Sequence, residues 1–567
     1  MDSKTVYRQW LNAPDLDDAL RSELAAIEGD DTEIEDRFYK ELEFGTAGLR
    51  GVIGAGTNRM NIYTVSRVTQ GLADYINACD VPAEKKSVAI AYDCRHMSAE
   101  FARTAASVLN ANGIKAYVFE DLRPTPELSF TIRRLGCLSG INITASHNPA
   151  EYNGYKVYWS DGAQVTPPHD TGIMACVEKV TNLMNPKMMP RNEAEERGLY
   201  VSLGRADDEE FIGRILGEIK EPGAVLDAAD SISIVYTPLH GTGITIVPEA
   251  LKRAGFKNIH IVEEQADGDG AFPTVKNPNP EMPEAFVLAD KLGHEKNADL
   301  IIATDPDADR IGVHVRDTKG EYHALTGNMI GSLMCEYELS RRAQQGALPD
   351  DGFVVRSIVS GRMVDAIAKN YGVELTEVLT GFKYIGLKIL EAEQMGKGTF
   401  LFGYEESYGF LTGTYARDKD ACGAAVVLAE LCAYYKTKGL TPWEAVCALY
   451  KKYGFYTEKT ISVSRPGKAG LEEIAQTMKD IRSNPPVAFG EYAVTGFSDL
   501  NGPEETGLPK SNVLCFTLEC GWVTVRPSGT EPKIKYYIGV QSESEETAAA
   551  ALAGIEADLA EKYINRK

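Results

Sequence analysis

Short apolar runs and amphipathic stretches alternate along most of the chain, and their order repeats three times. Apolar runs bounded by turn residues indicate buried strands, whereas apolar residues at helical spacing indicate helices. The first unit places strands and helices alternately at 85–93, 98–113, 114–121, 125–136 and 137–145. Ser98 is the expected N-cap of the first helix, and Gly136 is expected to end the second.

The second and third units follow the same plan. The second alternates strands and helices at 231–239, 245–255, 257–264, 282–293 and 298–304. The third does so at 352–359, 361–372, 374–380, 385–396 and 398–404. This alternation predicts α/β domains with parallel or mixed sheets.

The last strand of each unit leads into a polar motif. Ser146 follows the first, DPDADR (305–310) follows the second, and EES (405–407) follows the third. Ligands of such sheets bind outside the carboxyl ends of the strands, so we expect one cleft built jointly by the three units. Three unrelated units with solvated loops would show the same pattern and remain the alternative.

After residue 456 the pattern changes to strands at 457–465, 513–529 and 533–542 and a final helix at 544–564. These elements predict a smaller α+β domain. The complete prediction is an α/β protein with three similar domains of mixed sheets and a smaller C-terminal α+β domain, arranged around a central cleft. The predicted domains span 1–205, 206–324, 325–456 and 457–567.

Composition and charge narrow the possible partners. The chain has 567 residues, with 59 Lys and Arg against 82 Asp and Glu, which gives a net charge of −23. Such a surface repels nucleic acid and anionic membranes, so we expect neither as a partner. No apolar run reaches the roughly 18 residues of a membrane span, and the acidic N-terminus lacks a signal-peptide core. The ten cysteines form no C-x-x-C pair, which favours a reducing compartment, and we predict a cytoplasmic protein.

The motif DPDADR places Asp305, Asp307 and Asp309 at alternate positions. Three carboxylates this close repel one another unless a cation neutralises them, so the motif predicts a hard divalent ion. An EF-hand loop needs Gly at its sixth position and Glu at its twelfth, where this chain has Arg310 and Arg316. Mg²⁺ is therefore favoured over Ca²⁺, and an acidic surface turn is the alternative.

Three further motifs have less specific patterns. RPSGTEPK (526–533) offers the arginine, hydroxyls and lysine that suit a phosphate, although Pro-Ser-Gly is also ordinary turn chemistry. It is not a Walker A loop, so nucleotide hydrolysis is not favoured. GYEES (403–407) offers carboxylates for sugar hydroxyls or acid–base work, and a solvated acidic loop would look the same. HGTG (240–243) lacks the third glycine of a dinucleotide fingerprint, because Ile246 stands there, and is interpreted as a turn before a helix.

Ser146 has no Gly-x-Ser-x-Gly elbow around it, and His147, its immediate neighbour, is badly placed to act as its base. The basic residues Arg50, Arg95 and His96 lie among small residues near the N-terminus. For these three residues a structural and a functional role both remain open.

The motifs TASHNP, DPDADR, GYEES and RPSGTEPK, in this order, resemble those of the α-D-phosphohexomutases. FGTAGLRG and GYEESYGFLTGTYARDKDA are most similar to the phosphoglucomutase branch, which includes phosphopentomutase-like members. The resemblance covers nearly the whole chain and implies a four-domain, heart-shaped isomerase with a central cleft. It implies interconversion of glucose 1-phosphate and glucose 6-phosphate through a phosphoserine, with glucose 1,6-bisphosphate as intermediate and activator.

The resemblance also implies roles for individual residues. Ser146 is the implied phosphoserine, and it would complete an Mg²⁺ site with Asp305, Asp307 and Asp309. The implied acid–base or charge-stabilising groups are Arg50, His147, Lys156 and Lys419. Thr380 and Gly381 are implied to discriminate sugars, and Glu405 and Ser407 to bind sugar hydroxyls. The implied phosphate loop contains Arg526, Ser528, Gly529 and Thr530.

One departure from the family pattern bears on the substrate. Many bifunctional phosphomannomutase/phosphoglucomutase members carry GEMSGH, and the position of its histidine is Gly409 here. Glucose is therefore favoured over mannose, with a phosphopentomutase or phosphomannomutase as the alternative. A catalytically silent sugar-phosphate binder and a metal-dependent phosphatase are further alternatives; the intact Ser146 and acidic motif speak against the first. The expected partner is a small sugar phosphate, and the expected state is a monomer or weak homo-oligomer.

Overall fold

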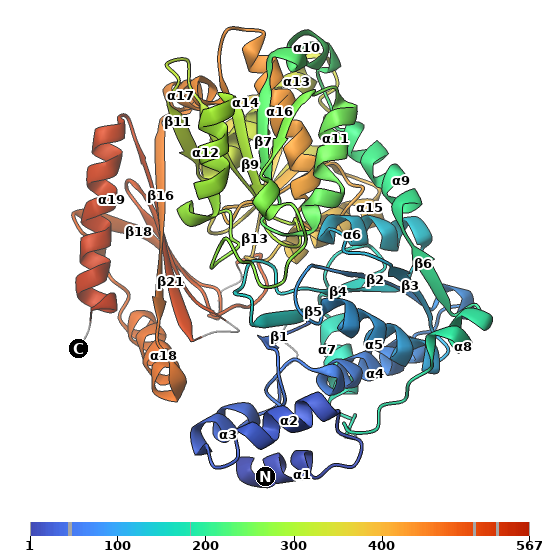
Figure 1. Cartoon of the computed structure of the whole chain (residues 1–567). Helices are drawn as coiled ribbons and strands as arrows, with labels where there is room; N and C mark the ends of the chain where they lie inside the picture. The colour runs from blue at the N-terminus through green and yellow to red at the C-terminus, as the bar shows by residue number, and fades with distance from the viewer. Residues whose placement is uncertain (1, 43–47, 182, 503–505, 529–531, 566–567) are drawn as a thin grey trace.

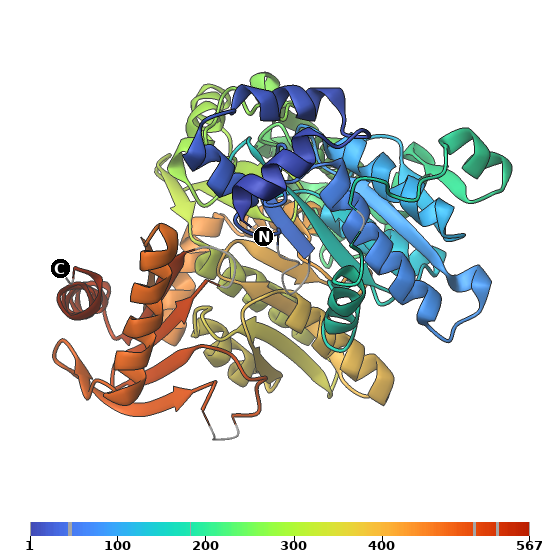
Figure 2. The same ribbon diagram turned by 90° about the horizontal axis from the view of Figure 1, so that it is seen from below.

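The computed structural model describes residues 2–42, 48–181, 183–502, 506–528 and 532–565. In this part of the chain the strands form four sheets, and we call the regions built on them domains I to IV (Figure 1). Domain I and domain IV lie at opposite sides of the molecule in both views (Figures 1 and 2). The predicted fold class, three α/β domains with mixed sheets and a smaller C-terminal domain, is confirmed.

Domain I is built on a six-stranded sheet with the order β1-β5-β4-β2-β3-β6. Its strands are β1 (Gly48–Val52), β2 (Ser87–Tyr92), β3 (Lys115–Phe119), β4 (Ser139–Ile143), β5 (Tyr152–Trp159) and β6 (Tyr200–Leu203). Its helices include α4 (Ile62–Ala78), α5 (Ser98–Ala111), α6 (Thr125–Leu135), α7 (His169–Val177) and α8 (Arg191–Glu196). Alternate residues of β2 face two separate apolar clusters, one with α4 and α5 and the other with α6, so helices cover both faces.

The α5 start differs from the prediction. Met97, with φ of +65°, occupies the N-cap position, and Ser98 is the first helical residue. The Ser98 hydroxyl is used elsewhere, because it donates a hydrogen bond to the buried carboxylate of Asp93 (2.7 Å). Gly136 ends α6 in the left-handed conformation (φ +64°), as predicted.

Domain II has a five-stranded sheet, β11-β10-β9-β7-β8, in which β7, β8 and β9 are parallel. Its strands are β7 (Ser233–Thr237), β8 (Asn258–Ile261), β9 (Leu300–Thr304), β10 (Ile311–Arg316) and β11 (Tyr322–Leu325). Helices α11 (Val247–Ala254) and α12 (Val287–Lys296) pack with it, and α9 (Arg205–Leu216) and α10 (Pro222–Ala228) precede it.

Domain III has a four-stranded sheet, β13-β12-β14-β15. Its strands are β12 (Gly352–Ser357), β13 (Glu374–Val378), β14 (Thr399–Glu405) and β15 (Gly409–Thr412). Its helices are α13 (Gly327–Gln344), α14 (Met363–Tyr371), α15 (Lys383–Met395), α16 (Ala421–Lys436) and α17 (Pro442–Tyr453). The α16 helix is apolar on most faces because it is buried between domains II and III, in the largest apolar cluster.

Domain IV is an antiparallel sheet of six strands, β16-β21-β20-β19-β18-β17. The strands are β16 (Phe455–Ser464), β17 (Ala488–Phe489), β18 (Tyr492–Asp499), β19 (Leu514–Leu518), β20 (Gly521–Pro527) and β21 (Lys533–Ser542), with α18 (Gly467–Ser483) and α19 (Glu545–Leu559). Three N-terminal helices that the sequence pattern did not predict, α1 (Ser3–Leu11), α2 (Asp18–Ala26) and α3 (Asp31–Phe38), pack below domain I (Figure 1). Within the described residues, no helix combines the length and the apolar character that crossing a bilayer requires.

Candidate active site

The serine loop after β4 and the acidic motif after β9 meet across the boundary between domains I and II. Ser146 Oγ donates a hydrogen bond to Asp305 Oδ2 at 2.7 Å, although the two residues are 159 positions apart. Ser146 has φ of +53°, a left-handed conformation that non-glycine residues rarely adopt. Thr144 Oγ1 accepts from Ser146 N (2.8 Å) and supports this turn of the backbone.

His147 lies closer to the serine than its sequence position led us to expect. Its Nδ1 is 3.1 Å from Ser146 Oγ, within hydrogen-bonding distance, so adjacency in sequence does not place it badly. Burial in the site and the neighbouring Arg310 and Arg50 hold the pKa of His147 well below its usual value. The imidazole is therefore neutral near pH 7 and can accept a proton only transiently.

Arg95 ties the serine loop to domain I. Its guanidinium donates to the carbonyls of Ser146 (2.5 Å), Pro149 (2.8 Å) and Tyr152 (3.0 Å), and also to that of Asn148. Its Nε lies 3.2 Å from Asp93 Oδ2, so the buried charge is paired. Arg95 therefore has a structural role, and the His96 side chain is exposed. Arg50, on β1, donates instead to Asn148 Oδ1 (3.3 Å) and points to the serine loop.

The acidic motif forms a compact group of carboxylates. Asp305, Asp307 and Asp309 are buried and have oxygens within 4.8 Å of one another. Asp307 Oδ2 accepts from Lys156 Nζ (2.7 Å) and Thr125 Oγ1 (2.8 Å), and Lys419 Nζ lies 3.0 Å from Asp309 Oδ2. The Oδ1 atoms of Asp307 and Asp309 are buried and have no hydrogen-bond partner among the described residues. Clustered carboxylate oxygens with unused acceptors are the donor set that a hard divalent cation takes, so the residues fit Mg²⁺.

The charges of the motif respond strongly to this environment. Burial and the charges of Asp307 and Asp309 hold the pKa of Asp305 well above its usual value. Burial alone would also raise the pKa of Asp309, but the charges of Lys419, Lys156 and Arg310 outweigh it and lower that pKa. The site thus accepts negative charge only where a cation lies beside it.

Lys419 and its neighbours connect domain III to domain I. Besides Asp309, its ammonium lies 3.0 Å from Asp418 Oδ1, and the same carboxylate accepts from Tyr158 Oη (2.9 Å) and Gln164 Nε2 (3.0 Å) of domain I. The ammonium also lies 5.5 Å from the centroid of the Phe382 ring. Lys419 is therefore held by several groups at the junction of three domains.

The sugar-loop candidates come together at the end of β14. Glu405 Oε1 accepts from Gly381 N (2.6 Å), which joins the two predicted recognition segments. The Thr380 hydroxyl is buried without a partner among the described residues. Ser407 lines a cavity of about 670 Å³ between domains III and IV, together with Glu406 and Tyr537. Of the four sugar candidates, Ser407 borders this open space, whereas Glu405 is buried and does not line it.

The phosphate-loop candidates are only partly described. Arg526, at the end of β20, donates to Tyr537 Oη (3.4 Å), and Ser528 N donates to Lys533 O (2.8 Å). Gly529 and Thr530 lie outside the described residues. The motif lies between two strands, as predicted.

Sequence reasoning missed three residues that take part in the site. Arg310, the last letter of the acidic motif, donates its N–H to Asp305 Oδ1 (3.0 Å) and its guanidinium to Glu281 Oε1 (2.5 Å). Thr125 donates a hydrogen bond to Asp307, and Asp418 forms an ion pair with Lys419. Arg310 could have been identified from its motif, whereas Thr125, which begins a helix of domain I, gave no signal.

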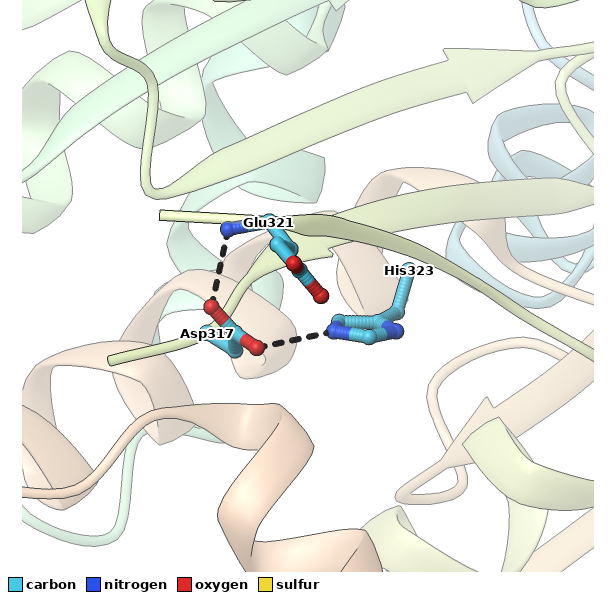
Figure 3. A group of neighbouring side chains, drawn as sticks. All are labelled: Asp317, Glu321 and His323. Carbon is cyan, nitrogen blue, oxygen red and sulfur yellow. Dashed lines mark hydrogen bonds and ion pairs between the residues drawn. The ribbon is translucent and has the colours of Figure 1, made fainter. Parts of the chain in front are cut away.

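A second acidic group, Asp317, Glu321 and His323, lies away from this site (Figure 3). Asp317 Oδ1 accepts from the backbone N–H groups of Lys319 and Glu321 (2.8 Å each), and Oδ2 lies 3.1 Å from His323 Nε2. His323 also stacks on Trp443 at 3.9 Å. The carboxylate of Asp317 is thus used to close the turn between β10 and β11.

Four family models match the chain consecutively. They are described as phosphoglucomutase/phosphomannomutase alpha/beta/alpha domains I, II and III and C-terminal domain, and they match residues 41–184, 213–320, 326–453 and 461–555. Two relatives named phosphoglucomutase come from Staphylococcus haemolyticus JCSC1435 and Staphylococcus aureus MRSA252. The first is 37% identical over 89% of this chain and 91% of its own length, and the second 36% over 90% and 92%.

Solved structures share the fold at low sequence identity. The open form of parafusin, a phosphoglucomutase from Paramecium, superimposes with a TM-score of 0.68 at 18% identity and covers 93% of this chain and 96% of its own. A phosphoglucomutase/phosphomannomutase family protein from Burkholderia thailandensis gives 0.66 at 18% identity and covers 92% and 98%.

Proposed function

Because the chain belongs to the phosphoglucomutase/phosphomannomutase family, we propose that it is a phosphoglucomutase that interconverts α-D-glucose 1-phosphate and glucose 6-phosphate. The choice of glucose is supported by the relatives named phosphoglucomutase and by Gly409 at the position of the family histidine. The proposal includes a cytoplasmic location, which the ten free cysteines favour.

One observation carries the proposal. Ser146 Oγ is buried and lies 2.7 Å from Asp305 Oδ2, in a group of three carboxylates from another domain. A serine prepared for acyl transfer would need a base oriented by a third group, and an oxyanion hole. A serine beside carboxylates that suit a divalent cation instead fits a phosphoryl carrier, because phosphoryl transfer depends on positioning and neutralisation of charge.

In the proposed cycle, Ser146 carries a phosphoryl group. Its Oγ–P bond breaks as the 6-hydroxyl oxygen of glucose 1-phosphate bonds to phosphorus, and the hydroxyl proton passes to a nearby base. The bound glucose 1,6-bisphosphate then turns so that its 1-phosphate faces Ser146. Ser146 Oγ takes that phosphoryl group, the 1-oxygen regains a proton, and glucose 6-phosphate leaves. Atoms and charge balance, because the enzyme ends with the phosphoserine that it began with.

Ser146, Asp305, Asp307 and Asp309 would hold Mg²⁺, which would supply charge neutralisation for the phosphoryl group when bound. His147, Lys156, Lys419 and Arg50 are the proposed acid–base and charge-stabilising groups. His147 is the neutral base nearest to the serine oxygen. Lys156 and Lys419 already contact the acidic motif and would turn toward phosphoryl oxygens.

Substrate contacts are proposed for domains III and IV. Glu405 would accept hydrogen bonds from sugar hydroxyls, and Ser407 would donate to them. These hydroxyls must be reachable in both orientations of the sugar. Thr380 and Gly381 would contribute to the same recognition site. Arg526, Ser528, Gly529 and Thr530 would hold the phosphate that is not reacting. A single phosphate loop must accept both ends of the sugar, so its recognition should rest on the phosphate itself.

A coupled assay with glucose, mannose and ribose 1-phosphates, Mg²⁺ and catalytic bisphosphate tests the proposal. We expect glucose 1-phosphate to be the preferred substrate, and mass spectrometry to find one phosphate on the Ser146 peptide. Ser146→Ala should lose nearly all mutase activity. Equal turnover of ribose 1-phosphate would overturn the choice of glucose, and an active Ser146→Ala variant would overturn the carrier role.

A further inference from the structure

The turn after β7, residues 238–243, lies beside the acidic motif and has no role in the proposed reaction. Its residues Leu239 and His240 have φ of +48° and +62°, in the left-handed region that disfavours side chains. Of the six other described non-glycine residues with positive φ, Ser146, Ala308 and Tyr408 lie one in each of three site loops, and the remaining three are Met97, Phe272 and Asn297. Such conformations persist only where their surroundings hold them, and they gather at functional sites.

A chain of hydrogen bonds that runs from the buried Thr237 to the exposed Thr274 holds the turn. Thr237 Oγ1 donates to Gln265 Oε1 (2.6 Å), and Gln265 Nε2 donates to Thr274 Oγ1 (2.9 Å). His240 Nε2 lies 2.9 Å from Thr274 Oγ1, and its Nδ1 lies 3.3 Å from the Asp267 carbonyl oxygen. Because a carbonyl oxygen only accepts, we assign the proton to Nδ1, so that Nε2 accepts from the Thr274 hydroxyl. Each group in the chain then has a partner of the correct kind.

One side of the turn supports the acidic motif. Thr242 N donates to Pro306 O at 2.8 Å. Gly241 approaches the motif so closely that a Cβ at this position would lie 2.4 Å from Pro306 Cα. A Cβ at Gly243 would lie 2.6 Å from the hydroxyl of Thr304, the last residue of β9. The motif therefore rests directly on this turn.

The other side reaches the serine loop of domain I. The His240 ring lies 6.4 Å from the Phe272 ring, which lies 5.0 Å from the guanidinium carbon of Arg95. Arg95 is the residue that binds the serine-loop carbonyls. In addition, a Cβ at Gly270 would lie 2.4 Å from the backbone nitrogen of His96, so the loop that carries Phe272 packs against domain I.

We propose that His240 is a positioning residue that aligns the serine loop of domain I with the acidic motif of domain II. Its imidazole connects the turn that contacts Pro306 to the loop that carries Phe272 and contacts Arg95. The catalytic consequence rests on the proposed function. The alignment of the cation site does not depend on the proposed function, because metal binding can be measured without turnover.

Mn²⁺ binding to the full-length protein, followed by electron paramagnetic resonance, is the first test. In His240→Asn, the shorter amide side chain can still donate a hydrogen bond to the Asp267 carbonyl oxygen. It does not reach the Thr274 hydroxyl and so cannot accept a hydrogen bond from it. We expect Mn²⁺ to bind about fivefold to tenfold more weakly, at the lower end of what loss of a supporting group costs a metal site. His294→Asn, an exposed histidine on α12, is the matched control and should bind as the wild type does.

Thr274→Val tests the same chain of hydrogen bonds from its exposed end, where the substitution leaves the core intact. It should weaken Mn²⁺ binding in the same direction, and it decides the proposal if His240→Asn does not fold. Wild-type Mn²⁺ affinity in folded Thr274→Val or His240→Asn would overturn the positioning role.

Kinetics provide the second test. In His240→Asn we expect kcat to fall about tenfold, with KM for glucose 1-phosphate nearly unchanged, because sugar and phosphate contacts belong to domains III and IV. A higher KM with an unchanged kcat would contradict the proposal. If the wild type turns over no sugar 1-phosphate, the proposed function fails, while the Mn²⁺ comparison still decides the role of His240.

Discussion

Replacing Lys419 with methionine tests how the acidic motif is kept stable without a metal. The Lys419 ammonium lies 3.0 Å from Asp309 Oδ2, and its side chain is only 9% exposed. At an effective dielectric constant of about 20, such a pair has a Coulomb energy of about 5–6 kcal/mol, part of which desolvation offsets. Asp418 keeps its hydrogen bonds from Tyr158 and Gln164, so the loss falls on Asp309, which retains Lys156 at 3.5 Å. Breaking a buried pair costs about 3–5 kcal/mol, and we expect about 3 kcal/mol here.

Differential scanning fluorimetry with and without Mg²⁺ measures this effect. Without Mg²⁺, Lys419→Met should melt about 6–12 °C below the wild type, at about 2–4 °C per kcal/mol for a domain of this size. Mg²⁺ should raise the melting temperature more in the variant, because the cation replaces the missing charge. Turnover should stay about 100-fold or more below wild type, since Mg²⁺ cannot replace Lys419 in its proposed action on the substrate. Lys388→Met, which removes a half-exposed surface pair, is the control. Equal Mg²⁺-induced shifts in Lys419→Met and wild type would refute the reasoning.

Asp307→Asn should raise the Mg²⁺ concentration for half-maximal activity by about tenfold or more, and Asp317→Asn, in the turn of domain II, should leave it unchanged in the same titration. Gly409→His should lower kcat without creating activity on mannose 1-phosphate, since a Cβ at Gly409 would lie 2.2 Å from Lys419 Cδ and displace that lysine; parallel assays on both sugars decide this. Burial raises the pKa of Glu430 to about 7, so its protonated form gives stability that is present below pH 4.5 and is lost as the pH rises through 7. Glu430→Gln should therefore flatten the fall in melting temperature between about pH 5 and 8, and an unchanged slope would contradict the assignment.

Local patterns were sufficient for the alternating strands and helices of domains I to III that they predicted, but not for further elements such as β1, α4, α13 and α16. Strand β2 is buried at every position, and α6 has Pro126 in its first turn and Gly136 directly after its last residue, so each signal lies within or beside its own element. The predicted N-cap failed because Ser98 donates to Asp93, a partner that becomes available only when β2 and α5 pack together. The three N-terminal helices were missed because their apolar residues form a cluster with α4, which a local pattern does not reveal.

The site could be predicted only as far as its motifs extend along the chain. The contact between Ser146 and Asp305 joins positions 159 residues apart. The strand-end pattern predicted only that both would border one cleft, and the direct pairing was implied by the family resemblance alone. Among the groups that hold the site together, Arg95 and Thr125 belong to none of the four motifs, and Asp418 lies in the quoted segment 403–421 but had no role assigned to it. Their roles follow from where backbone carbonyls and carboxylates lie in space, so the sequence alone could not distinguish them from ordinary structural residues.

The charge of the site reconciles an acidic protein with an anionic substrate. The net charge of −23 would repel a sugar phosphate at long range, but at physiological ionic strength charges beyond about 8 Å are largely screened. Within the site, basic groups from four domains oppose the acidic ones. The acidic groups are the three aspartates of the motif together with Glu405 and Asp418. The basic groups are Arg50, Lys156, Arg310, Lys419 and Arg526. A divalent cation on the motif would shift the local balance of charge toward positive. We therefore expect the acidic motif to favour a phosphorylated ligand only when a cation is bound, so that substrate binding as well as the proposed chemistry would depend on the metal.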